Sequence, residues 1–202
     1  AQMNKNLPRV MGNSFVHLRD VDIIVEEDRP IPTLPGAEIT DIERKIGEYC
    51  ASLVHDGDTL QLGIGGIPDA VVTFLKDKKD LGLHTEMAAD GIVDLIEAGI
   101  INNKKKTLHP GKCIATFAAG SQRLYDFLDD NPNFELHGVD YVNDPNVIAM
   151  NDNMVSINSC IQVDLAGQIN AEVVKGMQFS GVGGQVDFIR GARMSKGGRS
   201  II

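Results

Sequence analysis

The carboxylate with the clearest chemical potential in the sequence is Glu86. It lies in an otherwise apolar run, residues 83–87, just before Asp90-Gly91. An acidic residue at the carboxyl end of a strand in an α/β sheet points into the crevice where such sheets bind ligands. Partial removal from water makes a carboxylate there a better nucleophile. A second interpretation stays open, in which Glu86 is an acid of a helix first turn that faces solvent.

Two glycine-rich loops could bind a ligand through their backbone. They are Gly-Ile-Gly-Gly-Ile-Pro at 63–68 and Ser-Gly-Val-Gly-Gly-Gln at 180–185. Glycine lets a ligand approach the backbone closely, and free N–H groups at a helix start favour an anion. Two loops that converge on one ligand could aim a pair of amides at a developing oxyanion. The alternatives are a tight turn without a ligand for the first loop and a mobile surface loop for the second.

Three further polar residues are candidates of lower rank. The Asn143 amide could donate to a carbonyl oxygen, although Asn before Asp-Pro is also a common turn residue. Asn158, inside an alternating segment, faces solvent or is held by partners. Lys196 could reach a phosphate, and a solvated lysine is the alternative.

The elements that must position these groups alternate between strand and helix. Thr40 and Glu43 form a capping box, after which Ile42, Ile46, Tyr49, Cys50 and Leu53 recur at helical spacing. We expect helices over residues 40–53, from Pro68 onward, over 91–98 and over 121–129, and strands over 59–62, 81–86 and 113–118.

This alternation predicts an α/β fold with a mostly parallel sheet flanked by helices. The last third differs, because residues 154–164 alternate in period two and the Ala166-Gly167 corner leads into residues 168–173. That pattern predicts a β-hairpin-rich C-terminal part. Residues 1–38 carry four of the eight prolines and an acidic stretch, which is typical of an extended linker.

Composition excludes several classes of function. The 202 residues are 43% hydrophobic and 23% charged, which provides for a sizeable core and excludes a disordered chain. A balance of 19 basic against 28 acidic residues gives a net charge of −9, so nucleic acid and anionic membranes are not expected partners. The chain has no 18-residue apolar run that would predict a membrane span. Its three Cys and five His lack metal-ligand spacing, which predicts free thiols in a reducing cytoplasm and no metal site.

Four motifs occur in one order along the chain. They are residues 63–68, His84-Thr85-Glu86-Met87 followed by Asp90-Gly91, Asn143-Asp144-Pro145, and residues 180–188. As an ordered set they resemble the acetyl-CoA hydrolase/transferase branch of the class I CoA-transferases, with 4-hydroxybutyrate and butyryl-CoA:acetate CoA-transferases as the nearest subfamilies. The resemblance implies two similar α/β halves, of which this chain is the second. Residues 1–38 would then be the linker that leaves an absent N-terminal half, and residues 39–202 the catalytic domain.

The resemblance also assigns roles to residues. It implies that Glu86 forms a glutamyl-CoA thioester, that the Ile64 and Gly184 amides face the oxyanion, and that Asn143 is a side-chain donor. The CoA contacts that it implies are Gly63, Ile64, Gly65, Gly66, Ile67, Asn158, Ser180, Gly184 and Lys196.

The implied reaction moves CoA between a short-chain acyl-CoA, 4-hydroxybutyryl-CoA or butyryl-CoA, and acetate. CoA is then a substrate, and neither a metal nor a redox cofactor is expected. The implied partners are the acyl-CoA, the carboxylate, the N-terminal half and further copies of the protein. The alternatives are an acyl-CoA hydrolase on the same scaffold, a non-catalytic CoA-binding half, and a nicotinamide dehydrogenase. The last is disfavoured because Pro68 stands where a dinucleotide-binding loop has its third glycine.

Overall fold

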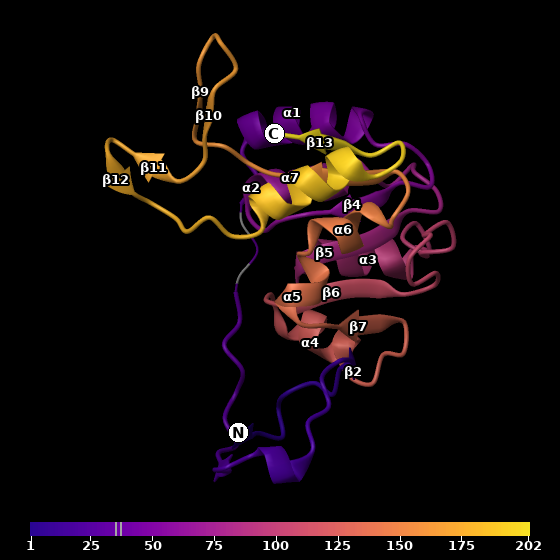
Figure 1. Ribbon diagram of the computed structural model, residues 1–202, viewed down its shortest axis with the longest axis vertical. Helices are drawn as coiled ribbons and strands as arrows, with labels where there is room; N and C mark the ends of the chain where they lie inside the picture. Colours follow the sequence, from indigo (N-terminus) through magenta and orange to yellow (C-terminus); the bar gives the residue numbers. More distant parts are fainter. Residues whose placement is uncertain (35, 37) are drawn as a thin grey trace.

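The computed structural model describes residues 1–34, 36 and 38–202, and its central feature is a seven-stranded sheet (Figure 1). Pro35 and Ala37, which belong to the predicted linker, lie outside the described residues. Every neighbouring pair of strands in this sheet is parallel. In spatial order the strands are β13 (Arg199–Ile201), β8 (Met154–Ile157), β4 (Thr59–Gln61), β5 (Gly82–Ala88), β6 (Cys113–Ala118), β7 (Phe134–Leu136) and β2 (Met11–Gly12). The predicted α/β class with a mostly parallel sheet is confirmed.

Helices cover both faces of the sheet. Along β6, Cys113 and Ala115 join one hydrophobic cluster and Ile114 joins the other, as the period of two requires. The first cluster takes its helical residues from α1 (Asp41–Ser52), α2 (Gly66–Thr73), α3 (Gly91–Glu97) and α4 (Gln122–Leu128). The second takes them from α5 (Val139–Val142), α6 (Pro145–Ala149) and α7 (Gln185–Met194). The sheet is therefore buried on both sides, as parallel sheets are.

Helix α1 begins at the predicted capping box. The Thr40 hydroxyl accepts from the Glu43 N–H, and the Glu43 carboxylate accepts from the Thr40 N–H at 2.7 Å. The side of α1 that packs inward carries the small residues Gly47 and Ala51, because α2 passes very close to it. The apolar stripe that marks this helix in the sequence lies mostly on the outside, with Ile42 73% and Tyr49 66% exposed.

The predicted strand over residues 154–164 is wrong in its length. β8 ends at Ile157, and all four of its residues are buried because it lies inside the parallel sheet. The predicted hairpin is confirmed beyond it, where β9 (Gln162–Val163) pairs with β10 (Ile169–Asn170). A second hairpin joins β11 (Val173–Val174) to β12 (Met177–Gln178). Both hairpins project from the sheet and helices, as Figure 1 shows.

Two other boundaries differ from expectation. Helix α2 begins at Gly66, two residues before Pro68, and Gly65 is its N-cap. Helix α7 and strand β13 follow the second glycine loop, and α5, α6 and β7 lie between α4 and β8; none of these was predicted.

The N-terminal segment contributes to the sheet edge. Besides β2, it contains β1 (Gln2–Met3), which pairs in parallel with β3 (Val25–Glu26), and the short 3-10 helix η1 (Leu18–Asp20). The division into a linker over 1–38 and a domain over 39–202 stays a prediction. No helix within the described ranges is long and apolar enough to cross a membrane.

Candidate active site

The carboxyl ends of β8, β4 and β5 bring polar side chains to one edge of the sheet. These strands are neighbours, and they end at or near Asn158, Gln61 and Glu86. Asn158 Nδ2 donates to Gln61 Oε1 at 3.1 Å. In open α/β sheets this edge is where ligands bind.

Glu86 is half-buried on the face of the sheet that α5 and α7 cover. Asn143 Nδ2 donates to Glu86 Oε2 at 2.7 Å. Asn143 is the C-cap of α5 and only 8% exposed, so its amide is held by the end of that helix. The fold thus joins two predicted site residues that stand 57 positions apart in the sequence.

Gly184 lies directly against this pair. It is the N-cap of α7, and an added Cβ would overlap Glu86 Oε2 and lie 2.6 Å from Asn143 Nδ2. Its φ of −87° is open to any residue, so glycine is needed here for space and not for backbone conformation. Because the start of a helix carries free N–H groups and a partial positive charge, this position favours a carboxylate or an oxyanion.

The first glycine loop reaches the same edge from the β4 side. Thr85 Oγ1 donates to the Leu62 carbonyl at 2.8 Å, so residues 63 and 64 continue beside the strand end that carries Glu86. Gly65 has a φ of +110° and is the N-cap of α2, a conformation that glycine adopts without strain. Ile64 is 49% exposed.

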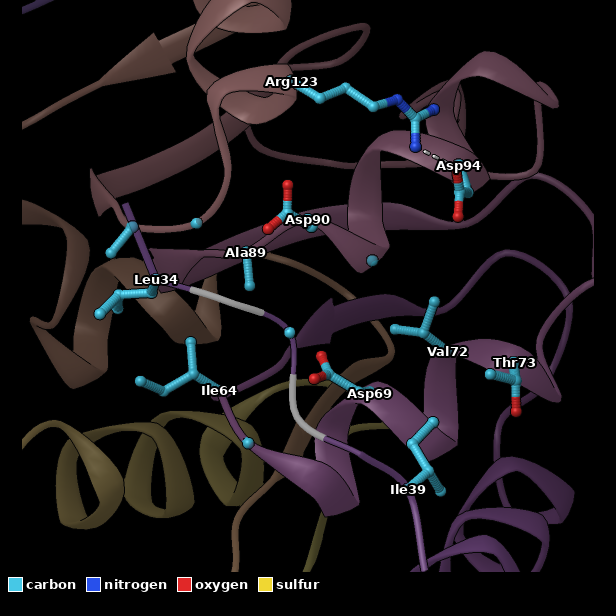
Figure 2. Close-up of a pocket in the computed structure, with 15 residues that line it drawn as sticks. Leu34, Ile39, Ile64, Asp69, Val72, Thr73, Ala89, Asp90, Asp94 and Arg123 are labelled. Carbon is cyan, nitrogen blue, oxygen red and sulfur yellow. Dashed lines mark hydrogen bonds and ion pairs between the residues drawn. The ribbon is translucent and has the colours of Figure 1, made fainter. Parts of the chain in front are cut away.

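A cavity of about 450 Å³ opens beside this loop, on the α2 and α3 side of the sheet. Figure 2 shows Ile64 and Leu34 at one side of it and Asp69 and Asp90 nearby. At its far side Arg123 is paired with Asp94 at 2.7 Å, and it also pairs with Glu97 outside the lining. With its one arginine already paired with acids, the lining is apolar and acidic, which suits an uncharged part of a ligand better than a phosphate.

Other predicted site residues lie apart from Glu86. Ser180 is exposed near the second hairpin, where its Oγ donates to the Ala171 carbonyl at 3.4 Å. Lys196 precedes β13 at the amino edge of the sheet, where its ammonium lies 3.7 Å from Asp152. Ile67 is half-buried in the first turn of α2. The CoA-binding roles of these three residues stay predictions.

Three groups that shape this edge were not predicted from the sequence. Gln61 carries no signal beyond its place at a strand end, and Thr85, although it stands in the motif of residues 84–87, has the appearance of one more strand residue. His84 stands inside a motif that was noticed, but its contacts depend on α5 and α7. In the part of the chain that the structure describes, no cluster of three or more His, Cys, Asp or Glu side chains has the geometry of a metal site.

Comparison with known proteins defines the class to which this fold and site belong. A family model described as the acetyl-CoA hydrolase/transferase C-terminal domain matches residues 120–202. The chain belongs to the acetyl-CoA hydrolase/transferase family, as the ordered motifs predicted.

Individual relatives sharpen this assignment. The chain is 60% identical over 202 residues to 4-hydroxybutyrate coenzyme A transferase of Clostridium kluyveri, covering 100% of this chain and 47% of that protein. It is 50% identical over 201 residues to succinyl-CoA:cyclohexane-1-carboxylate CoA transferase of Geobacter metallireducens, covering 100% and 46%. The crystal structure of 4-hydroxybutyrate CoA-transferase from Porphyromonas gingivalis superposes with a TM-score of 0.90 at 50% identity, over 100% of this chain and 48% of that one. The chain spans about half the length of these relatives.

Proposed function

We propose that the full-length protein is a CoA-transferase in which the Glu86 carboxylate accepts CoA from a short-chain acyl-CoA and passes it to acetate. The observation that carries this proposal is the contact of Glu86 Oε2 with Asn143 Nδ2 at 2.7 Å, directly under Gly184 at the start of α7. The similarity to proteins named as CoA-transferases supports it. We take 4-hydroxybutyryl-CoA or butyryl-CoA as the donor.

The proposed reaction begins with attack of a Glu86 oxygen on the thioester carbonyl. The C–S bond breaks, which gives an acyl-glutamyl anhydride and the CoA thiolate. The thiolate then attacks the glutamyl carbonyl and expels the carboxylate of the donor, leaving a glutamyl-CoA thioester. Acetate enters by the reverse sequence. These steps move CoA from one carboxylic acid to another, so CoA is a substrate. No oxidation state changes, and the proposed steps call for no redox cofactor or metal.

Each tetrahedral intermediate carries a negative oxygen that the site must stabilise. We assign this task to the Asn143 amide and to the backbone N–H groups of Gly184 and Ile64. Loss of one such donor typically costs about 3–4 kcal/mol in the transition state. In the resting state the Asn143 amide also orients the nucleophile, because it donates to Glu86 Oε2.

CoA would enter along the carboxyl edge of the sheet. The uncharged part of CoA fits the cavity beside Ile64. The lining of this cavity carries the acids Asp69 and Asp90, which disfavour a phosphate because both are negatively charged. We propose backbone contacts from Gly63, Gly65 and Gly66. Ile67, Asn158, Ser180 and Lys196 are retained as candidate contacts on the basis of the family resemblance alone.

We further propose that this chain works with the remaining half of the protein, in an oligomer, in the cytoplasm. These statements rest on the sequence and on the length of the relatives. An acyl-CoA hydrolase is the second candidate, because the family includes hydrolases and the half-exposed Glu86 leaves a thioester within reach of water. Release of CoA in the presence and absence of acetate separates the two, since acceptor-independent release identifies the hydrolase.

Borohydride trapping tests the nucleophile. The full-length protein is mixed with butyryl-CoA, reduced with borohydride and mapped by peptide mass, and we expect the reduced glutamate at position 86. Glu86→Ala removes the label, whereas Glu48→Gln, a change of an exposed glutamate on α1, retains it. A reduced glutamate at any other position refutes the assignment.

A further inference from the structure

His84 lies directly below the Glu86 site. It stands two residues before Glu86 on β5, so both side chains project from the same face of the strand. The ring is fully buried, and its Nε2 lies 2.8 Å from the Val142 carbonyl oxygen. Because a carbonyl oxygen only accepts, Nε2 carries the hydrogen. One hydrogen bond therefore fastens the residue before Asn143 to the strand that carries Glu86.

The same ring also contacts α7. It packs against Phe188 with the ring centroids 6.1 Å apart, and the Phe188 N–H donates to the Gly184 carbonyl at 3.0 Å. His84 thus touches the first turn of the helix whose N-cap presses on Glu86. Both elements that shape the site converge on this one side chain.

The surroundings of His84 keep its ring neutral. Burial lowers its pKa to about 4 against the opposing effect of the hydrogen bond to the Val142 carbonyl, and the charges of Lys106, His109 and His137 add to the lowering. Lys106 donates to the carbonyls of Leu83 and Lys112 and so stays beside the strand. The His84 Nδ1 atom has no hydrogen-bond partner among the residues that the structure describes. The ring therefore holds a fixed donor on Nε2 at the pH at which a carboxylate nucleophile works.

We propose that His84 is a positioning residue, which holds Asn143 and Gly184 in place around the Glu86 carboxylate through Val142 and Phe188. This inference rests on the proposed function, because it takes Glu86 as the reacting group. This role requires no contact between His84 and the acyl group. Its effect reaches the reaction through the placement of two other groups.

Two polar substitutions of matched character test the donor. In His84→Gln the amide nitrogen reaches the position of Nε2 and can donate to the Val142 carbonyl, whereas the amide of His84→Asn is one bond too short. We expect kcat of the full-length enzyme to stay within about threefold in the Gln variant and to fall about 10- to 100-fold in the Asn variant. KM for butyryl-CoA should change little in both. Equal kcat values for the two variants would overturn the proposal.

A double-mutant cycle asks whether His84 acts through Asn143. If it does, His84→Asn combined with Asn143→Ala lowers kcat by less than the product of the two single losses, because one of the two groups that His84 positions is already gone. Independent losses that multiply would refute positioning. Leu128→Ala, a core change on α4 below the opposite face of the sheet, lowers the melting temperature and serves as the control for destabilisation without loss of kcat.

The borohydride label keeps this inference separate from the proposed function. If the wild-type enzyme carries no label at Glu86, the proposed function fails, whatever the His84 variants do. If the label is present and His84→Asn turns over at the wild-type rate, only the positioning role fails. A labelled Glu86 that reacts more slowly in His84→Asn than in His84→Gln supports both.

Discussion

The two glycine-rich turns at the carboxyl edge look alike in sequence and differ in what they constrain. In the first, Gly65 supplies a positive φ, and Gly66 packs against the Glu43 carboxylate of the α1 capping box. In the second, Gly183 also has a positive φ, of 55°, but a Cβ added at Gly184 would meet Glu86 and Asn143, whereas one added at Gly181 would meet no described residue within 4 Å. Both turns lead into a helix, α2 and α7 respectively.

This difference shows that glycine density alone does not reveal the role of a turn. In the first turn the close contact of Gly66 is with a helix cap, so this contact serves the stability of the fold, beside the backbone contacts proposed for the turn. The second ends on the candidate nucleophile, so its close packing serves the chemistry. Substitutions in the two turns test this division.

The largest effect is expected for Gly184→Ala. The added methyl group would overlap Glu86 Oε2, so the carboxylate or α7 must move, and we expect kcat to fall about 1000-fold. Gly181→Ala is the matched control in the same turn, because, among the described residues beyond its chain neighbours, no atom lies within 4 Å of its added Cβ. Steady-state kinetics of the full-length enzyme measure both. Near-normal turnover by Gly184→Ala would end the distinction between the turns.

Asn143→Ala should have the next largest effect. It removes the amide that donates to Glu86 Oε2, and we expect kcat to fall about 100-fold, or about 3 kcal/mol. Asn146→Ala, at an exposed amide near the start of α6, serves as the control. If both variants turn over equally fast, the amide at position 143 has no part in the reaction.

The contribution of His84, which packs against α7 behind the second turn, to the stability of the fold should depend on pH. The pKa of His84 is lowered to about 4 from 6.5, so the unfolded chain binds this proton more readily than the folded one. Stability is fully present above about pH 6.5 and is lost as pH falls toward 4, by up to about 3 kcal/mol. His84→Gln should flatten this dependence in urea unfolding between pH 4 and 7. An unchanged pH dependence would contradict the assignment.

The smallest effect is expected in the first turn. Gly66→Ala pushes an added methyl group into the Glu43 carboxylate and disturbs the α1 cap, which should cost about 1 kcal/mol of stability. The extra loss should largely disappear when Glu43 is already Ala, because the two residues are coupled. Thermal unfolding of the single and double variants measures this. Full additivity would show that Gly66 acts elsewhere.

Local patterns in the sequence predicted much of the sheet. The strand at Cys113–Ala118 and the Thr40–Glu43 cap occur where they were expected, because each depends on neighbours along the chain. The long strand after Met154 was wrong, because alternation does not show that a buried parallel strand ends at Ile157. Helical periodicity identified the apolar stripe on α1, but close contact with α2 buries Gly47 and Ala51 instead.

The candidate site was predictable only as a set of motifs. Sequence could nominate Glu86, Asn143 and Gly184, but their contact depends on where α5 and α7 cross the sheet, and neither helix was predicted. The role of His84 depends on the same two crossings. Lys196 shows the opposite outcome. Its residue type suits a phosphate, but the fold places it at the amino ends of the strands, away from Glu86.

The outermost strand on the β2 side of the sheet has a consequence for aggregation. The strand at one margin, β2, is two residues long. An incoming chain would find too few free backbone groups there to extend the sheet. The interior strands, of which β5 is seven residues long, are thereby shielded at that margin from lateral pairing with a strand of another chain.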